Sequence, residues 1–160
     1  MSADFNTADS NTADAEPTGT EYSTAWVAYA LQGTGVFGFV LGPLIALVVS
    51  YVRRDAAAAG YLATHHRWLI RTFWWTLAGY LAGLAVIIAG AWPIISDLVG
   101  EVVRAGSHGQ EFSFAIDWDS IFATVGGAAL GGLGMLCVWI WNIYRIMRGA
   151  FLLADRSPAP

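Results

Sequence analysis

The residues best suited to binding chemistry lie in one segment, where His65, Arg67 and Trp68 are followed by Arg71. In a helix, Arg67 and Arg71 lie four positions apart on one face, and two guanidinium groups beside a tryptophan suit an anionic headgroup or an acidic partner. The same arginines could instead only anchor the end of a membrane helix, which is the simpler and favoured role. These four residues are therefore the candidate lipid- or partner-binding site, on a cytoplasmic interfacial surface.

Two adjacent histidines do not predict a metal site here. Neighbouring side chains on a helix point about 100° apart, so His65 and His66 cannot easily hold one ion, and the sequence places no cysteine or acid at a spacing that completes a ligand set. We expect His65, three residues before Trp68, to fix this segment by a hydrogen bond. The sequence also contains no serine with a partnered histidine, no paired carboxylates and no phosphate-binding loop. We therefore predict no enzymatic activity, cofactor or metal.

The composition indicates which elements must position the segment. Of 160 residues, 56% are apolar and only 12% are charged, whereas about a quarter of a soluble domain is usually charged. A water-soluble core could not hide so much apolar surface, so we expect an all-α integral membrane protein. Its partners are then the lipid bilayer, other membrane proteins or further copies of itself, and no nucleic acid.

Three uncharged runs, 22–52, 72–96 and 120–144, each exceed the roughly 20 apolar residues that a crossing helix needs. They predict a bundle of three transmembrane helices. The expected organisation is a disordered acidic tail at 1–21, a transmembrane domain at 22–153 with spans near 24–52, 70–97 and 120–147 and an outer loop at 98–119, and a short tail at 154–160.

The first run contains helix-weakening residues, among them Gly33, Gly35, Gly38 and the pair Gly42-Pro43. One interpretation is a single long, kinked crossing. The other is a short re-entrant or interfacial helix followed by a crossing from Val36 onward, which would add a fourth helix near the N-terminus. The single crossing is favoured, because a break would leave backbone groups unsatisfied in lipid.

The arginines predict an orientation. Most of them flank the first loop or follow the third run, whereas the second loop has Arg104 among four acids. The positive-inside rule then places the first loop and the C-terminus in the cytoplasm, and the N-terminus and second loop outside. We expect a multi-pass protein of a bacterial inner membrane.

Each run also contains a pair of glycines four residues apart, a spacing that lets two helices approach closely. Such pairs can form an oligomer interface or, as we favour, pack the helices of one chain against each other. The expected packing residues are Gly38 and Gly42, Gly79 and Gly83, and Gly127 and Gly131.

The order of these motifs resembles a known family. The motifs are Tyr51-Val52-Arg53-Arg54-Asp55, then His65-x-Arg67-Trp68-x-Ile70-Arg71-Thr72-Phe73-Trp74, and finally Trp139-x-Trp141-x-x-Tyr144-Arg145-Ile146. Over roughly residues 24–153 the chain is similar to small bacterial membrane proteins of the DUF4870 group, also described as Tic20-like. The resemblance implies a compact bundle of three or four membrane helices and little about activity. Members usually have glutamine where this chain has Leu69, and the loop 97–119 is longer than usual for the group.

Two classes of function follow from these features. The first is a non-enzymatic membrane protein that acts by association, as an accessory or scaffold subunit. The alternative is a small oligomeric channel or transport component, with Tic20-like translocation as the analogy. A transport path requires a continuous polar route through the fold, and a scaffold requires exposed small-residue faces without such a route.

Overall fold

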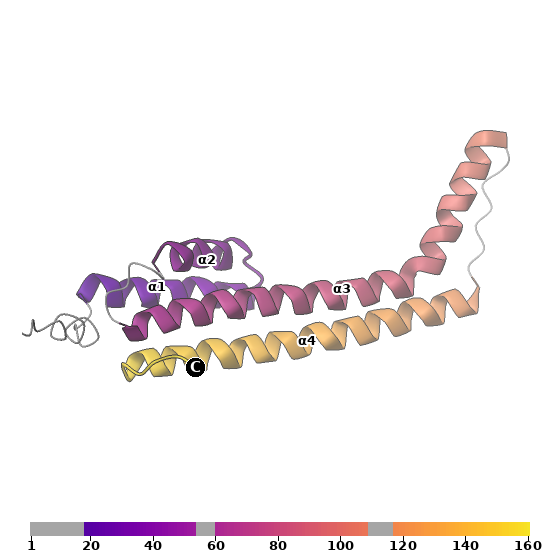
Figure 1. Cartoon of the computed structure of the whole chain (residues 1–160). Helices are drawn as coiled ribbons and strands as arrows, with labels where there is room; N and C mark the ends of the chain where they lie inside the picture. The colour runs from indigo at the N-terminus through magenta and orange to yellow at the C-terminus, as the bar shows by residue number, and fades with distance from the viewer. Residues whose placement is uncertain (1–17, 54–59, 109–116) are drawn as a thin grey trace, which may run out of the picture. The chain divides into compact units, whose positions relative to one another are not determined.

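The computed structural model describes residues 18–53, 60–108 and 117–160, and all regular structure among them is helical. The helices are α1 (Gly19–Thr34), the short 3₁₀ helix η1 (Gly35–Phe37), α2 (Leu41–Arg53), α3 (Gly60–His108) and α4 (Trp118–Ala154) (Figure 1). The all-α prediction is confirmed for the described residues. Most of the expected acidic tail, up to residue 17, lies outside them.

Two boundaries differ from the expected ones. Helix α1 begins at Gly19, inside the predicted tail, because Thr18 and Glu21 form a capping box: the Glu21 amide donates to the Thr18 hydroxyl at 3.4 Å, and the Thr18 amide donates to the Glu21 carboxylate at 3.0 Å. Helix α3 continues to His108, so the first part of the predicted loop 98–119 is helical.

The first apolar run is not one long helix, so the single kinked crossing is wrong. Helices α1 and α2 pack against each other as a hairpin joined by η1 and a turn (Figure 1). Gly38 permits the reversal, since its φ of 85° is a left-handed conformation that other residues rarely adopt. Beyond the turn, Gly42 lies against the Thr34 side chain, where a Cβ would collide.

A break in the first run would be costly if it left backbone groups unsatisfied in lipid, and the hairpin turn reduces that cost. The Phe39 amide donates to the Thr34 carbonyl at 3.3 Å, and the Gly38 amide donates to the Gly35 carbonyl at 3.2 Å. The Trp139 indole N–H, from α4, donates to the Val36 carbonyl at 2.9 Å. The carbonyl groups of Thr34, Gly35 and Val36 are therefore satisfied, the last of them by a side chain from a distant part of the sequence.

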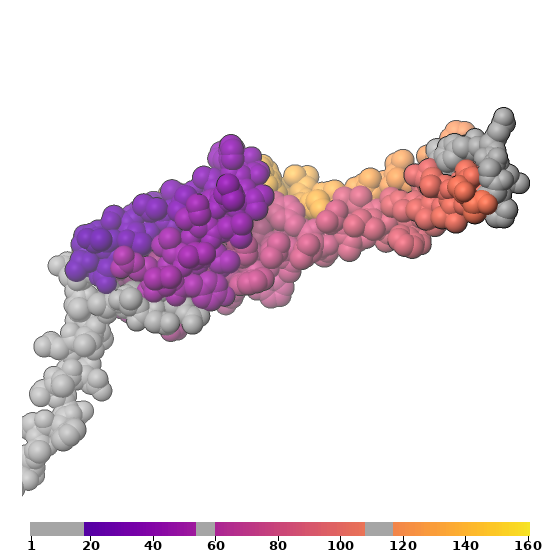
Figure 2. Space-filling model, turned by 90° about the horizontal axis from the view of Figure 1, so that it is seen from above, coloured from indigo at the N-terminus to yellow at the C-terminus, as the bar shows by residue number. Residues whose placement is uncertain are grey.

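The chain forms two compact units that share α3 and α4. Unit 1 comprises residues up to Thr76 together with Trp139–Pro160, and unit 2 comprises Leu77–Val138. In unit 1, the adjoining surfaces of α1 and α2 are visible in Figure 2 as indigo and purple atoms. The core of unit 1 consists of Ala25, Ala28, Tyr29, Leu62, Trp68, Leu69, Leu153 and Ala159.

Unit 2 consists of parts of α3 and α4 that pack on each other through glycine. A Cβ added at Gly127 would lie 2.7 Å from the Gly90 Cα, and one at Gly131 would lie 2.5 Å from the Gly83 carbonyl oxygen. Two backbones approach this closely only where side chains are missing. The contact leaves most of the apolar surface of both helices uncovered.

Candidate functional site

Trp68 is the centre of a cluster of arginine and aromatic side chains in unit 1. The guanidinium carbon of Arg145 lies 3.6 Å from the centroid of the Trp68 ring and 4.8 Å from that of Trp141. The guanidinium carbon of Arg71 lies 5.9 Å from the Trp68 ring. Cations at such distances are attracted to the ring face, and the attraction strengthens as water is excluded. The cluster therefore holds two positive charges around one indole.

Arg145 fastens α4 to α3. Its Nε donates to the Thr72 hydroxyl at 2.9 Å, and that hydroxyl donates to the Trp68 carbonyl at 2.7 Å. In return, the Trp68 indole N–H donates to the Arg145 carbonyl at 3.4 Å. Arg145 is 7% exposed, and its Nη2 atom is buried without a hydrogen-bond partner. No acid among the described residues forms an ion pair with it.

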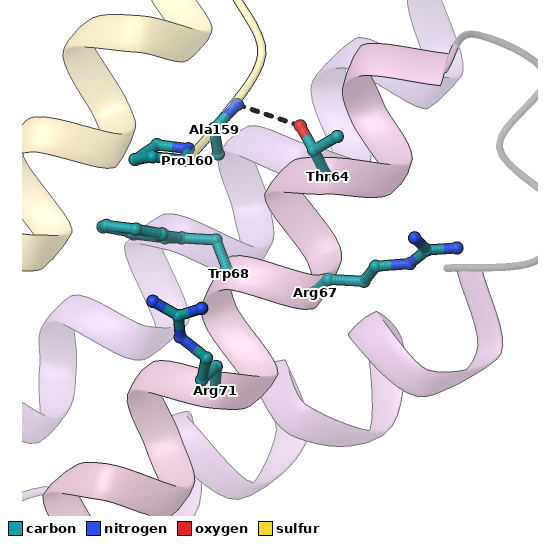
Figure 3. A pocket seen from close by; sticks show the side chains of 6 residues that line it. All are labelled: Thr64, Arg67, Trp68, Arg71, Ala159 and Pro160. Carbon is teal, nitrogen blue, oxygen red and sulfur yellow. Dashed lines mark hydrogen bonds between the residues drawn. The ribbon is translucent and has the colours of Figure 1, made fainter.

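A hollow of about 260 Å³ lies beside Trp68 (Figure 3). Arg71 lies next to the indole, whereas the guanidinium of Arg67 extends away from it, at the rim. Part of the wall comes from the C-terminal tail, which is held by a hydrogen bond of 2.9 Å from the Ala159 amide to the Thr64 hydroxyl. The lining residues are Thr64, Arg67, Trp68, Arg71, Ala159 and Pro160.

His65 does not belong to this surface, which corrects the predicted site. It is fully buried, and its Nε2 lies 2.9 Å from the Ser157 carbonyl oxygen while its Nδ1 lies 2.8 Å from the Tyr29 hydroxyl. Because a carbonyl oxygen only accepts, Nε2 carries the proton and Nδ1 accepts from Tyr29. His65 thus joins α1, α3 and the C-terminal tail, and it holds the wall of the hollow in place.

The two histidines face different partners. The Nδ1 atom of His66 lies 3.4 Å from the hydroxyl of Ser50 in α2. Both histidines precede the expected span 70–97. Burial lowers the pKa of His65, opposed by its bond to Ser157, and burial, followed by the charges of His65 and Arg53, lowers the pKa of His66. The neutral forms are therefore favoured in the folded chain, and their role is to position helices.

The six predicted packing glycines differ in what they contact. Gly79, Gly83, Gly127 and Gly131 all lie at the contact between α3 and α4, where added Cβ atoms would collide with the opposite helix. Gly42 lies at the contact between α1 and α2. Gly38 has no neighbour within 4 Å of its Cβ position, so its predicted packing role is wrong, and it serves the turn instead.

Three residues that form contacts in the two units were not predicted from the sequence, namely Arg145, Gly90 and Tyr29. Arg145 was grouped with the anchoring arginines, although it follows Trp141 by four positions, the same spacing that singled out Arg67 and Arg71. That spacing could have identified it. Gly90 lies seven residues after Gly83 and has no glycine four residues away, so the four-residue spacing does not identify it. Tyr29 carries no signal within its apolar run, because its partner is distant in the sequence.

Comparisons of the chain with family models, with curated proteins and with solved structures found no match. What the protein does must therefore be inferred from the placement of its own residues.

Proposed function

We propose that this chain is an integral membrane protein that acts by association, as an accessory or scaffold subunit without enzymatic activity. The supporting observation is the exposed apolar surface of two helices. Helices α3 and α4 each contain a stretch of 18 residues with mean hydropathy 1.9, of which only 6% is buried. A core helix of a soluble protein would be mostly buried, whereas a helix in lipid presents such a surface to acyl chains.

The side chains on this surface are large. In unit 2, Leu81 is 57% exposed, Leu130 is 67% exposed and Leu133 is 58% exposed. In water, an apolar surface of this kind would associate or aggregate. In the hydrocarbon of a bilayer it needs no cover, so two crossings by α3 and α4 agree with both its size and its chemistry.

The hairpin of α1 and α2 would enter the same bilayer without crossing it. At 1.5 Å per residue, the 16 residues of α1 and the 13 of α2 extend about 24 and 20 Å, less than the hydrocarbon thickness of about 30 Å. The tip of the hairpin is apolar and exposed, at Phe37, Phe39, Val40 and Leu41. We therefore propose a re-entrant hairpin beside two crossing helices, in a multi-pass protein of a bacterial inner membrane.

Association is supported by open glycines on α4. Cβ atoms added at Gly126, Gly132 or Gly134 would meet no atom within 4 Å, so another helix could approach the backbone there. Residues 121–138 of α4 contain Thr124 as their only hydroxyl, amide or charged side chain. A scaffold needs such small-residue surfaces, and a transport path would need more polar groups at this depth.

A second candidate, a small oligomeric transport component, is favoured by a different observation. Unit 1 buries several polar side chains, namely Gln32, Ser50, His65, His66, Thr72, Asn142 and Arg145. The Thr76 hydroxyl extends this set by donating to the Asn142 side-chain oxygen at 3.2 Å. Flux of small ions into vesicles containing the purified protein would support this candidate against the scaffold.

The proposal is tested in two steps in cells that express the full chain. Membrane integration predicts that the protein remains in the pellet after alkaline carbonate extraction, and recovery in the soluble fraction would overturn it. Association predicts that Gly132→Cys, in a Cys137→Ser background, forms a disulfide-linked dimer in oxidised membranes. Leu84→Cys, on α3, is the matched control for random collision, and equal dimer yields would count against a specific contact.

A further inference from the structure

We infer that the hollow beside Trp68 binds the phosphate group of an anionic phospholipid headgroup, an inference that rests on the proposed location in a membrane. The observations behind it are an excess of positive charge, a hollow of suitable size, and the order of side chains along α3.

In the part of the chain that the structure describes, no acid forms an ion pair with the arginines around Trp68. Arg67 and Arg71 are exposed, and among the described residues neither forms an ion pair with an acid. Arg145 adds a third charge, buried against the same indole and with a buried Nη2 that has no partner. A buried cation without a nearby anion is costly. An anion bound beside Arg71 would lower that cost by its electrostatic attraction to Arg145, without contacting Arg145.

The hollow suits one end of a ligand. Its volume of about 260 Å³ is just below the range of about 300–1,000 Å³ typical of pockets that enclose whole small molecules. Arg71 presents a planar fork of N–H donors beside the indole (Figure 3), the geometry that matches phosphate oxygens in pairs. Arg67 lies at the rim, and its long exposed side chain can turn toward a bound anion within nanoseconds.

The order of residues along α3 favours a lipid over a soluble phosphate. After Arg71 come Trp74 and Trp75, 52% and 62% exposed, and then the apolar part of the helix. From Arg71 to Trp75 the helix rises about 6 Å. Arginine, then tryptophan, then aliphatic residues is the order in which phosphate, interface and hydrocarbon follow one another in a bilayer leaflet. A phosphate bound at Arg71 would leave its acyl chains next to lipid-facing surface.

The test measures lipid binding to the full chain in neutral detergent by native mass spectrometry. Dioleoyl phosphatidylglycerol is titrated against dioleoyl phosphatidylcholine, for the unchanged protein and for Arg67→Gln/Arg71→Gln. Loss of two arginines near an anionic headgroup should weaken binding of the first phosphatidylglycerol about 30-fold. Binding of phosphatidylcholine should weaken much less, because its choline cation offsets the charge of its phosphate. Arg104→Gln removes an exposed arginine from the far end of α3 and should leave both affinities unchanged.

Further outcomes decide the inference. Equal phosphatidylglycerol affinity in the double variant and the unchanged protein overturns it, as does an equal loss in Arg104→Gln. Displacement of the lipid by millimolar inorganic phosphate would show that the hollow takes free phosphate, and would overturn the lipid source. If the double variant loses helical content, Arg71→Lys replaces it. A larger loss of affinity for phosphatidylglycerol than for phosphatidylcholine supports the fork geometry, and an unchanged phosphatidylglycerol affinity refutes it. Carbonate extraction of the unchanged protein separately tests the membrane location.

Discussion

The contact between Gly90 and Gly127 gives a quantitative prediction for unit 2. In Gly127→Ala, the new Cβ would lie 2.7 Å from the Gly90 Cα and 3.1 Å from the Val86 carbonyl oxygen, both backbone atoms. Backbone cannot turn aside as a flexible side chain can, so the helices must separate. Overpacking of this kind costs about 1–3 kcal/mol. Alanine also gains about 1 kcal/mol over glycine in helix propensity, which partly hides that cost.

Gly132→Ala removes this ambiguity, because it makes the same substitution on the same helix where a Cβ meets nothing within 4 Å. The propensity gain is common to both variants, so the difference between them isolates the contact. We expect Gly127→Ala to be less stable than Gly132→Ala by about 1–3 kcal/mol, measured by SDS titration of the protein in mixed micelles and followed by circular dichroism. Equal midpoints for the two variants would show that α3 and α4 do not approach at Gly127.

Three more predictions concern the buried hydrogen bonds and the orientation. Tyr29→Phe leaves Nδ1 of His65 without its donor, and the free energy of unfolding should fall by about 1–3 kcal/mol in the same titration; an unchanged midpoint would contradict the 2.8 Å contact. Burial lowers the pKa of His65 from 6.5, so the unfolded state binds more protons just below that pH, and stability should fall as the pH decreases from 7 to 5. His65→Gln should flatten this dependence, and an equally steep slope would refute it. With Cys137 replaced by serine, a cysteine at Gly60 should resist a membrane-impermeant thiol reagent in intact cells while one at Ser107 reacts, and reversed labelling would invert the proposed orientation.

The sequence predicted the parts of the fold that depend on local pattern. Uncharged length identified α3 and α4, which are both long and apolar enough to cross a membrane. The four-residue spacing of Gly79 and Gly83, and of Gly127 and Gly131, agrees with the contact seen in unit 2. Both inferences depend only on features within a single helix, and packing against other elements does not change them.

The parts that sequence reasoning missed depend on residues far apart in the chain. The sequence allows a break in the first apolar run, before Val36, but does not favour it, because the cost of a break in lipid depends on whether the exposed carbonyls find donors. One of those donors is the indole of Trp139, 103 residues after Val36. His65 was assigned to a surface for the same reason: the partners that bury it, Tyr29 and Ser157, belong to other elements.

The hairpin also changes the parity of the proposed topology. Three crossings would place the N-terminus opposite the C-terminus, but a re-entrant hairpin followed by two crossings returns both to one side. That side would then contain the arginines flanking α3 at its start and α4 at its end, namely Arg53, Arg54, Arg67, Arg71, Arg145, Arg148 and Arg156. Arg104 alone would lie on the other side, where it pairs with Glu101 at 3.2 Å. Two crossings would therefore satisfy the positive-inside rule as well as three would. They would place the arginine-lined hollow on the cytoplasmic face, whose anionic lipids would supply the phosphate groups that we infer it binds.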